Sequence, residues 1–194
     1  MNEGVEVTDS FDDWEAAWGV AIVAKDWPRV QQLLMEACFI DGGDTIRLNE
    51  RYSRLVLPAL GRMDLISGES LSSLLVVVSG DVPDLDEVNR RGLLEFCRAG
   101  YRAMRDPAAR AWAESFIRDW LPACEALEVL IGMLRSSPED ARAEVLFGIA
   151  LAAQSISFEL GRRVAELIRE SSALPSAQLA EAVAAGLRAH GGNG

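Results

Sequence analysis

The side chains that could act as acids, bases or nucleophiles are few in this sequence and lie far apart. Its single histidine, His190, stands in a glycine-rich C-terminal stretch, so no serine or cysteine is expected to have a histidine base. The chain also contains no G-x-S-x-G nucleophile elbow and no glycine-rich phosphate loop. The sequence therefore predicts no catalytic residues, no bound cofactor and no enzymatic activity.

Metal binding is not expected from the acidic residues. The two adjacent pairs, Asp12–Asp13 and Glu139–Asp140, both lie where the first turn of a helix is expected. Carboxylate metal sites in helical proteins usually combine acids inside helices with histidine. Acids in a first turn are explained by the positive charge of the helix end, so the sequence predicts no metal site.

The cysteines and the N-terminal residues favour the cytoplasm. The cysteines are odd in number, and each falls on a predicted apolar stripe, as core thiols in a reducing compartment do: Cys38, Cys97 and Cys124. Residues 1–9 are acidic, lack the basic and apolar regions of a signal peptide, and are predicted to be disordered. The apolar run 145–153 is too short for a bilayer, which takes about 20 residues. We therefore expect a cytoplasmic protein without membrane contact.

Basic charge is concentrated between Asn89 and Arg110, where six arginines stand beside only two acids. Four of them follow at intervals of seven, four and three residues, which places them on one face of the helix predicted over 85–104: Arg91, Arg98, Arg102 and Arg105. Such a face would bind an acidic partner segment or an anionic ligand. The alternative is that these arginines pair within the protein, with the acidic residues of the first helix.

Tryptophans are numerous for a chain of this length, with five in 194 residues. Trp112, Phe116 and Trp120 form a stripe at intervals of four residues, as the core-facing side of a helix does. Tryptophan and arginine are also the residues that dominate protein-binding hot spots. Trp112 and Trp120 are therefore candidates for partner binding beside the four arginines, with core packing as the alternative.

The elements that position these residues are all predicted to be helices, with the most apolar one at the centre. Residues 145–153 carry no polar side chain, which is typical of a helix buried on every side. We expect a central helix over 138–170, either unbroken or bent around 154–157. The predicted fold class is all-α, an irregular single-domain bundle of about 8–9 helices over residues 10–189. Residues 190–194 are expected to form a flexible tail.

Prolines behind short polar residues mark three predicted helix starts. Asp26, Asp106 and Ser137 each precede a proline by one or two residues, as helix caps do. The glycine pair 42–43 is expected to end the second helix. Because the starts are irregularly spaced, the sequence predicts a bundle rather than a repeat array.

Two segments carry mixed signals. Pro58 stands inside the helical pattern of 45–66 and is expected to kink or split it near Leu57. Residues 74–78 fit either a buried helix or a strand. Helix is preferred there because no second strand is predicted to pair with them.

Residues 93–104, LLEFCRAGYRAM, and 116–127, FIRDWLPACEAL, carry a resemblance. In the pattern of their residues, these segments are similar to the acidic, cytoplasmic, all-helical chaperones that mature molybdenum oxidoreductases. The histidine-containing acidic signature of that family is absent, and Val82–Glu87 stands in its place. The resemblance covers less than a quarter of the chain, and the sequence is not assigned to that family.

Charge and surface pattern together favour a protein that binds another protein. The net charge of −11 repels nucleic acids and anionic membranes. We expect a non-enzymatic adaptor, dedicated chaperone or immunity-type inhibitor that holds its partner in a helical groove. One alternative is a self-assembling subunit, with Gly148, Ala152 and Ser155 as a close helix–helix contact. Another is a small-molecule-binding domain with an apolar pocket lined by tryptophans and an arginine.

Overall fold

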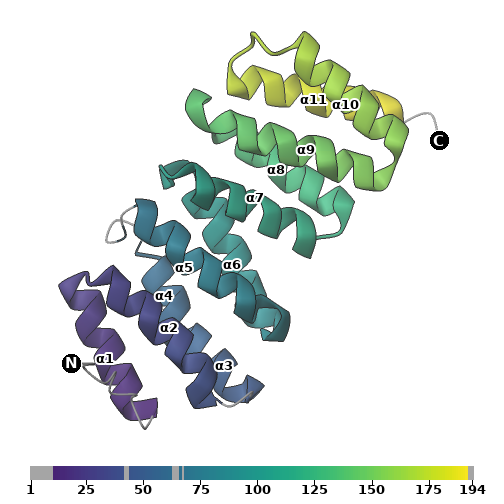
Figure 1. Cartoon of the computed structure of the whole chain (residues 1–194). Helices are drawn as coiled ribbons and strands as arrows, with labels where there is room; N and C mark the ends of the chain where they lie inside the picture. The colour runs from purple at the N-terminus through teal and green to yellow at the C-terminus, as the bar shows by residue number, and fades with distance from the viewer. Residues whose placement is uncertain (1–10, 42–43, 63–65, 67, 192–194) are drawn as a thin grey trace, which may run out of the picture. The chain divides into compact units, whose positions relative to one another are not determined.

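The computed structural model describes residues 11–41, 44–62, 66 and 68–191 (Figure 1). Over these residues the chain is helical and contains no strand, which confirms the predicted all-α bundle. It divides into two compact units, residues 1–93 and 94–194. The predicted lead over 1–9 and the glycines at 42–43 lie outside the described residues.

The first unit is built around its second helix. Its elements are α1 (Phe11–Ala24), α2 (Trp27–Asp41), α3 (Thr45–Arg51), the π-helical η1 (Tyr52–Val56), α4 (Leu57–Leu60), α5 (Gly68–Asp81), the 3-10 turn η3 (Val82–Asp84) and the first turns of α6 (Glu87–Gly100). Helix α2 packs against α1, α3 and α5. Its apolar side is buried in full: Val30, Leu33, Leu34 and Ala37.

The start of α2 lies where the sequence predicts it. The carboxylate of Asp26 accepts a hydrogen bond from the backbone N–H of Arg29 at 3.2 Å and so caps the helix. The chain turns from α1 into α2 at Lys25, whose φ of 57° lies in the left-handed region. The indole N–H of Trp14 then ties the two helices together by donating to the carbonyl of Leu33 at 2.7 Å.

Pro58 breaks the regular helix of 45–66, as predicted. Just before it, Tyr52–Val56 forms a π-helical turn, in which the N–H of Leu57 bonds to the carbonyl of Tyr52, five residues back. A proline ring meets the carbonyl four residues before it in a regular helix, and a widened turn gives it room. Residues 63–65 of the predicted segment lie outside the described residues.

Residues 74–78 are helical and belong to α5, as preferred from the sequence. The side of α5 that faces α2 is buried: Leu71, Leu74, Leu75 and Val78. At the end of α5 the hydroxyl of Tyr52 donates to the carboxylate of Asp81 at 2.7 Å, and both residues are buried. This buried bond connects α5 to the π-helical turn.

The second unit contains a four-helix bundle. Its elements are the last turns of α6, the 3-10 turn η4 (Tyr101–Ala103), α7 (Pro107–Trp120), α8 (Ala123–Ser136), the 3-10 turn η5 (Glu139–Ala141), α9 (Arg142–Ile156), α10 (Phe158–Glu170) and α11 (Ser176–Gly191). The closest helix pairs form a ring, α8 with α9, α9 with α10, α10 with α11 and α11 with α8 (Figure 1). Helix α7 packs on α8 and α9. Because α11 extends to Gly191, the first two residues of the predicted tail over 190–194 are helical, and the other three lie outside the described residues.

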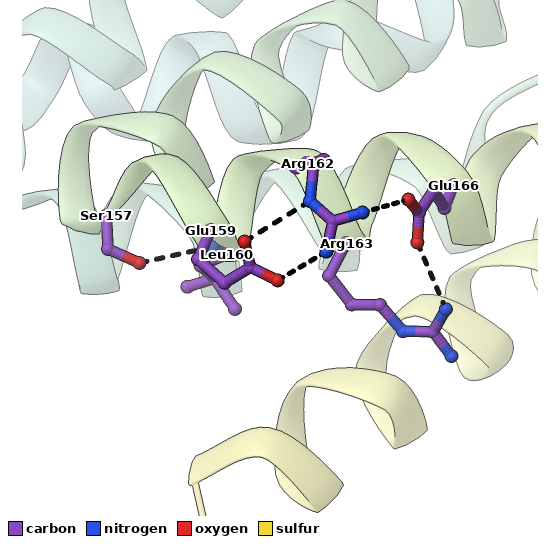
Figure 2. Close-up of polar contacts among 6 residues, drawn as sticks. All are labelled: Ser157, Glu159, Leu160, Arg162, Arg163 and Glu166. Carbon is purple, nitrogen blue, oxygen red and sulfur yellow. Dashed lines mark hydrogen bonds and ion pairs between the residues drawn. The ribbon is translucent and has the colours of Figure 1, made fainter.

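The central helix predicted over 138–170 is two helices that fold back on each other. Helix α9 ends at Ile156, Ser157 is extended with φ −159° and ψ 149°, and α10 packs against α9. The hydroxyl of Ser157 accepts the N–H of Leu160 at 3.1 Å and caps α10 (Figure 2). The break therefore lies within 154–157, where a bend was the predicted alternative, and the unbroken helix over 138–170 is wrong.

Phe147 contradicts the sequence prediction of a helix buried on every side, and Gly161 shows how closely the two helices pack. Phe147 of α9 is 62% exposed, so α9 has an open side. A Cβ at Gly161 would lie 2.8 Å from the Cα of Gln154, so the absence of a side chain lets α10 approach α9 closely.

Of the two helix starts predicted in the second unit, one is correct. Asp106 caps α7 by accepting the N–H of Ala108 at 3.0 Å. The hydroxyl of Ser137 instead donates to the carbonyl of Met133 at 2.8 Å, which closes α8, and α9 begins only at Arg142. A serine before a proline can satisfy either the helix behind it or the one ahead, and the sequence does not distinguish the two.

Candidate functional site

The four predicted arginines do not share one helical face. Helix α6 ends at Gly100, so only Arg91 and Arg98 lie on it. Arg102 belongs to the 3-10 turn and Arg105 to the loop that follows. The helix predicted over 85–104 is therefore confirmed over Glu87–Gly100 but ends earlier than predicted, and the single arginine face is wrong.

Tyr101 explains why the helix stops there. It is 2% exposed, and its hydroxyl donates to the carbonyl of Ala141 at 2.9 Å. Met104, also 2% exposed, follows in an extended conformation. Burial of these two side chains outweighs the local helix propensity of the segment, which is a weak preference.

The two predicted arginines that lie on α6 have acidic partners on the same helix. Arg91 pairs with Glu87 at 3.3 Å, and Arg98 pairs with Glu95 at 3.1 Å. Exposed pairs of this kind contribute little stability.

The other two arginines and the first helix behave differently. Arg102 and Arg105 are exposed and have no ion pair among the described residues. On α1, Glu15 pairs with Arg54 at 3.0 Å, so the acidic first helix is partnered by an arginine outside the predicted set.

Arg98 lies in a groove between the last turns of α6 and α8, which we refer to as the α6–α8 groove. It is open to solvent, has a volume of about 530 Å³, and is lined by Glu95, Arg98, Ala99, Glu128, Val129, Gly132, Met133 and Ser136. On α8 the lining residues Glu128, Gly132 and Ser136 follow at intervals of four, so they form one stripe along the helix. These three residues lie apart from the buried apolar residues of α8. Their regular spacing was a signal in the sequence that could have indicated this groove, and the sequence analysis did not use it.

Several of the residues that line the α6–α8 groove are small. Gly132 is exposed, and a Cβ built on it meets nothing within 4 Å. Ala99 and Ser136 are also small, and the buried Met133 offers an adaptable apolar surface. The charged lining residues are two acids and one arginine, so the groove carries both signs of charge. Its shape and polarity suit a protein segment with both apolar and charged side chains.

The two predicted tryptophans form the expected stripe but do not reach this groove. Trp112 stacks on Phe116 with ring centroids 5.2 Å apart, and Phe116 lies 6.1 Å from Trp120. Phe116 is buried, Trp112 is half-buried and Trp120 is 36% exposed. Neither tryptophan lines the α6–α8 groove, so the structure does not bring them together with Arg98.

Arg110, which the sequence groups with the exposed arginines, is a core residue. It is 4% exposed and donates to the carbonyls of Met104 and Arg105 at 3.2 and 3.3 Å. Its guanidinium also lies 3.5 Å from the carboxylate of Glu144. Arg110 therefore holds the loop that carries Arg105, and its role is structural.

Burial changes the titration of three groups in the second unit. It raises the pKa of Cys97 and that of Tyr101, to which the charge of Glu144 adds. It also raises the pKa of Glu114, against the opposing effect of Arg118. None of these three side chains lines the α6–α8 groove, so they give it no activated acid or nucleophile.

Four charged residues of α10 pair with one another, as Figure 2 shows. Arg162 lies between Glu159 and Glu166, and Arg163 also pairs with Glu166. Neighbours three and four residues apart on a helix meet in this way. This face is a solvated surface and offers no concentrated charge to a partner.

Comparisons with known proteins give no information on the function of these residues. No protein-family model, no curated protein and no solved structure matches the chain. Among the described residues, no three histidine, cysteine or acidic side chains come together as metal ligands would. Within the same residues, no helix has both the length and the apolar character needed to cross a membrane.

Proposed function

We propose that this protein is a non-enzymatic binding module that holds a helical segment of another protein in the α6–α8 groove. It would act as an adaptor, a dedicated chaperone or an inhibitor. The observation that carries the proposal is the groove of about 530 Å³ between two helices, lined by small residues and by charges of both signs. An amphipathic helix occupies such a groove with side chains spaced one turn apart.

Arg98 and Met133 supply the kinds of contact that protein interfaces favour, since arginine and methionine are enriched there. The pair of Arg98 with Glu95 is exposed, with side chains 49% and 62% accessible. Such a weak pair can be exchanged for a carboxylate of the partner. We therefore expect the partner segment to place an acid beside Arg98 and an aliphatic side chain over Gly132.

A matched pair of substitutions tests the groove. Gly132→Leu places a large side chain in the groove lining, whereas Gly19→Leu places the same side chain at an exposed position of α1 where a Cβ also meets nothing within 4 Å. Leucine favours helices more than glycine, so both variants are expected to fold. We expect wild-type protein and Gly19→Leu to capture the same partner from a lysate of the source organism. Gly132→Leu and Arg98→Glu should capture it about tenfold less well, by quantitative mass spectrometry.

Two results would contradict the proposal. One is a partner captured equally by wild-type protein, Gly132→Leu and Arg98→Glu, which would place the binding surface elsewhere. The other is that the folded wild-type chain captures no protein whose yield falls when Gly132→Leu or Arg98→Glu is used in its place. Circular dichroism of each variant keeps a folding defect distinct from a binding defect.

The two alternatives receive less support. Of the three residues proposed as a contact between copies, Gly148 and Ala152 are buried and Ser155 is exposed, and Glu114 packs over Gly148. Self-assembly would need another surface, such as the exposed Ile156 and Phe158 beside the α9–α10 turn, and a chromatographic size that rises with concentration would favour it. For a small-molecule site, the enclosed apolar cavity of the first unit that Trp18 helps to line measures only about 10 Å³, room for one water at most.

A further inference from the structure

A second groove lies in the first unit, between α3 and the first turn of α6. We refer to it as the α3–α6 groove. Its volume is about 590 Å³, and it is lined by Thr45, Ile46, Asn49, Glu50, Ser53, Asp86, Val88 and Asn89. These residues all belong to residues 1–93, so this groove is separate from the α6–α8 groove.

Two asparagines join the walls of the α3–α6 groove. The side-chain amide of Asn89 donates to the carbonyl of Asn49 at 3.0 Å and to its side-chain oxygen at 2.9 Å. The same oxygen of Asn49 accepts the N–H of Asp86 at 2.7 Å. These bonds fix the orientation of the Asn89 carboxamide, because its nitrogen must face the two acceptors of Asn49.

The fixed orientation leaves one acceptor of the groove without a donor. Asn89 is 2% exposed, and its Oδ1 is buried with no hydrogen-bond partner. A buried acceptor that lacks a donor costs free energy, and such exceptions in a folded protein call for an explanation. A ligand that brings N–H donors into the groove would supply what is missing.

The remaining lining residues define the ligand. The charged ones, Glu50 and Asp86, are both acids, and no lysine or arginine lines the groove. Arg54 partners Glu50, but it is shared with Glu15, so it does not neutralise the acids around it. The two exposed aliphatic side chains are Ile46, 78% exposed, and Val88, 74% exposed. These features match a long cationic side chain. Its charge would meet the acids, its donors would meet the free acceptor, and its stem would meet the aliphatic side chains.

We propose that the α3–α6 groove binds an arginine side chain of a partner protein. The aliphatic stem of that arginine packs on Ile46 and Val88, and its guanidinium donates to Glu50, Asp86 and the side-chain oxygen of Asn89. Arginine fits better than lysine because its planar group carries five donors, enough to serve both carboxylates and the side-chain oxygen of Asn89. This surface is independent of the α6–α8 groove and does not rest on the function proposed for it.

The test uses the full-length chain labelled with ¹⁵N and a blocked pentapeptide that contains two arginines. Nuclear magnetic resonance follows the side-chain amide signals of Asn49 and Asn89, which report on the groove directly. We expect both signals to shift and saturate as the peptide is added. The same peptide with glutamate in place of arginine should leave them unchanged.

Two double variants separate the groove from general attraction to an acidic surface. Glu50→Gln with Asp86→Asn removes both lining charges and keeps a cap on α6, because asparagine caps helices as well as aspartate does. Asp84→Asn with Glu87→Gln removes two charges from neighbouring exposed positions outside the lining. We expect the first pair to raise the Kd about tenfold and the second to change it less than about twofold.

Each contrary outcome overturns the proposal. Equal weakening by the two double variants would show attraction to net charge alone. Saturating binding that leaves the Asn49 and Asn89 side-chain signals in place would put the arginine elsewhere. A lysine peptide that binds as tightly as the arginine peptide would remove the role of the planar group.

Discussion

At the scale of the residue, burial decides how charges behave in the second unit. Glu114 is 4% exposed, packs over Gly148, and pairs with Arg118 at 3.0 Å. Burial raises the pKa of Glu114, Arg118 lowers it, and burial has the larger effect. The folded protein therefore holds this proton to a higher pH than the unfolded chain does.

Glu114→Gln tests this balance through the pH dependence of stability. Between the ordinary glutamate pKa of about 4.3 and the raised pKa of Glu114, the folded state binds more protons than the unfolded state. The contribution of Glu114 to the free energy of unfolding is thus fully present below pH about 4.3 and is lost as pH rises through the raised pKa. Urea denaturation should show the wild-type protein losing stability relative to Glu114→Gln over that range.

The control for this measurement is Glu125→Gln, the same substitution at an exposed position of α8. It removes one charge without changing a buried group. If the wild-type protein instead gained stability relative to Glu114→Gln as pH rose, the attraction of Arg118 would exceed the effect of burial.

At the scale of the element, local signals were predictable from the sequence and tertiary ones were not. Asp26 and Asp106 cap helices as predicted, because a cap depends on residues within one turn. The end of α6 was missed, because it depends on the bond from Tyr101 to Ala141, 40 residues away in sequence.

The candidate site was predictable only in part, for the same reason. Arg98 was identified from the sequence, since charge spacing on one helix is a local pattern. Its groove needs α8 beside α6, which no pattern within either helix encodes. Asn49 and Asn89 gave no signal either, because they meet across 40 residues of sequence.

Ser157 offers a test of how the α9–α10 hairpin is made. Ser157→Ala removes the acceptor for the N–H of Leu160, and losing a cap costs about 1 kcal/mol. Ser155→Ala is the matched control, because Ser155 lies inside α9 and its hydroxyl only donates back to the carbonyl of Leu151. Urea denaturation should show a loss of stability for Ser157→Ala and none for Ser155→Ala. Equal stability of the two variants would mean that packing alone breaks the helix.

At the scale of the whole molecule, the open question is whether residues 10–189 behave as the single domain predicted from the sequence. The two compact units meet at residues 93 and 94, inside α6. A helix is formed cooperatively, so one that runs through the boundary favours joint unfolding. Leu93, just before the boundary, is fully buried.

Two matched core substitutions measure this coupling. Leu33 in α2 and Leu130 in α8 are both fully buried, and replacing either by alanine should cost roughly 2–5 kcal/mol. If the chain is one cooperative domain, Leu33→Ala and Leu130→Ala each raise the rate of global hydrogen exchange in both units, as measured by mass spectrometry. Faster exchange confined to residues 1–93 for Leu33→Ala, and to 94–194 for Leu130→Ala, would show two domains. That result would also mean that the two grooves, one in each unit, can be studied in separate fragments.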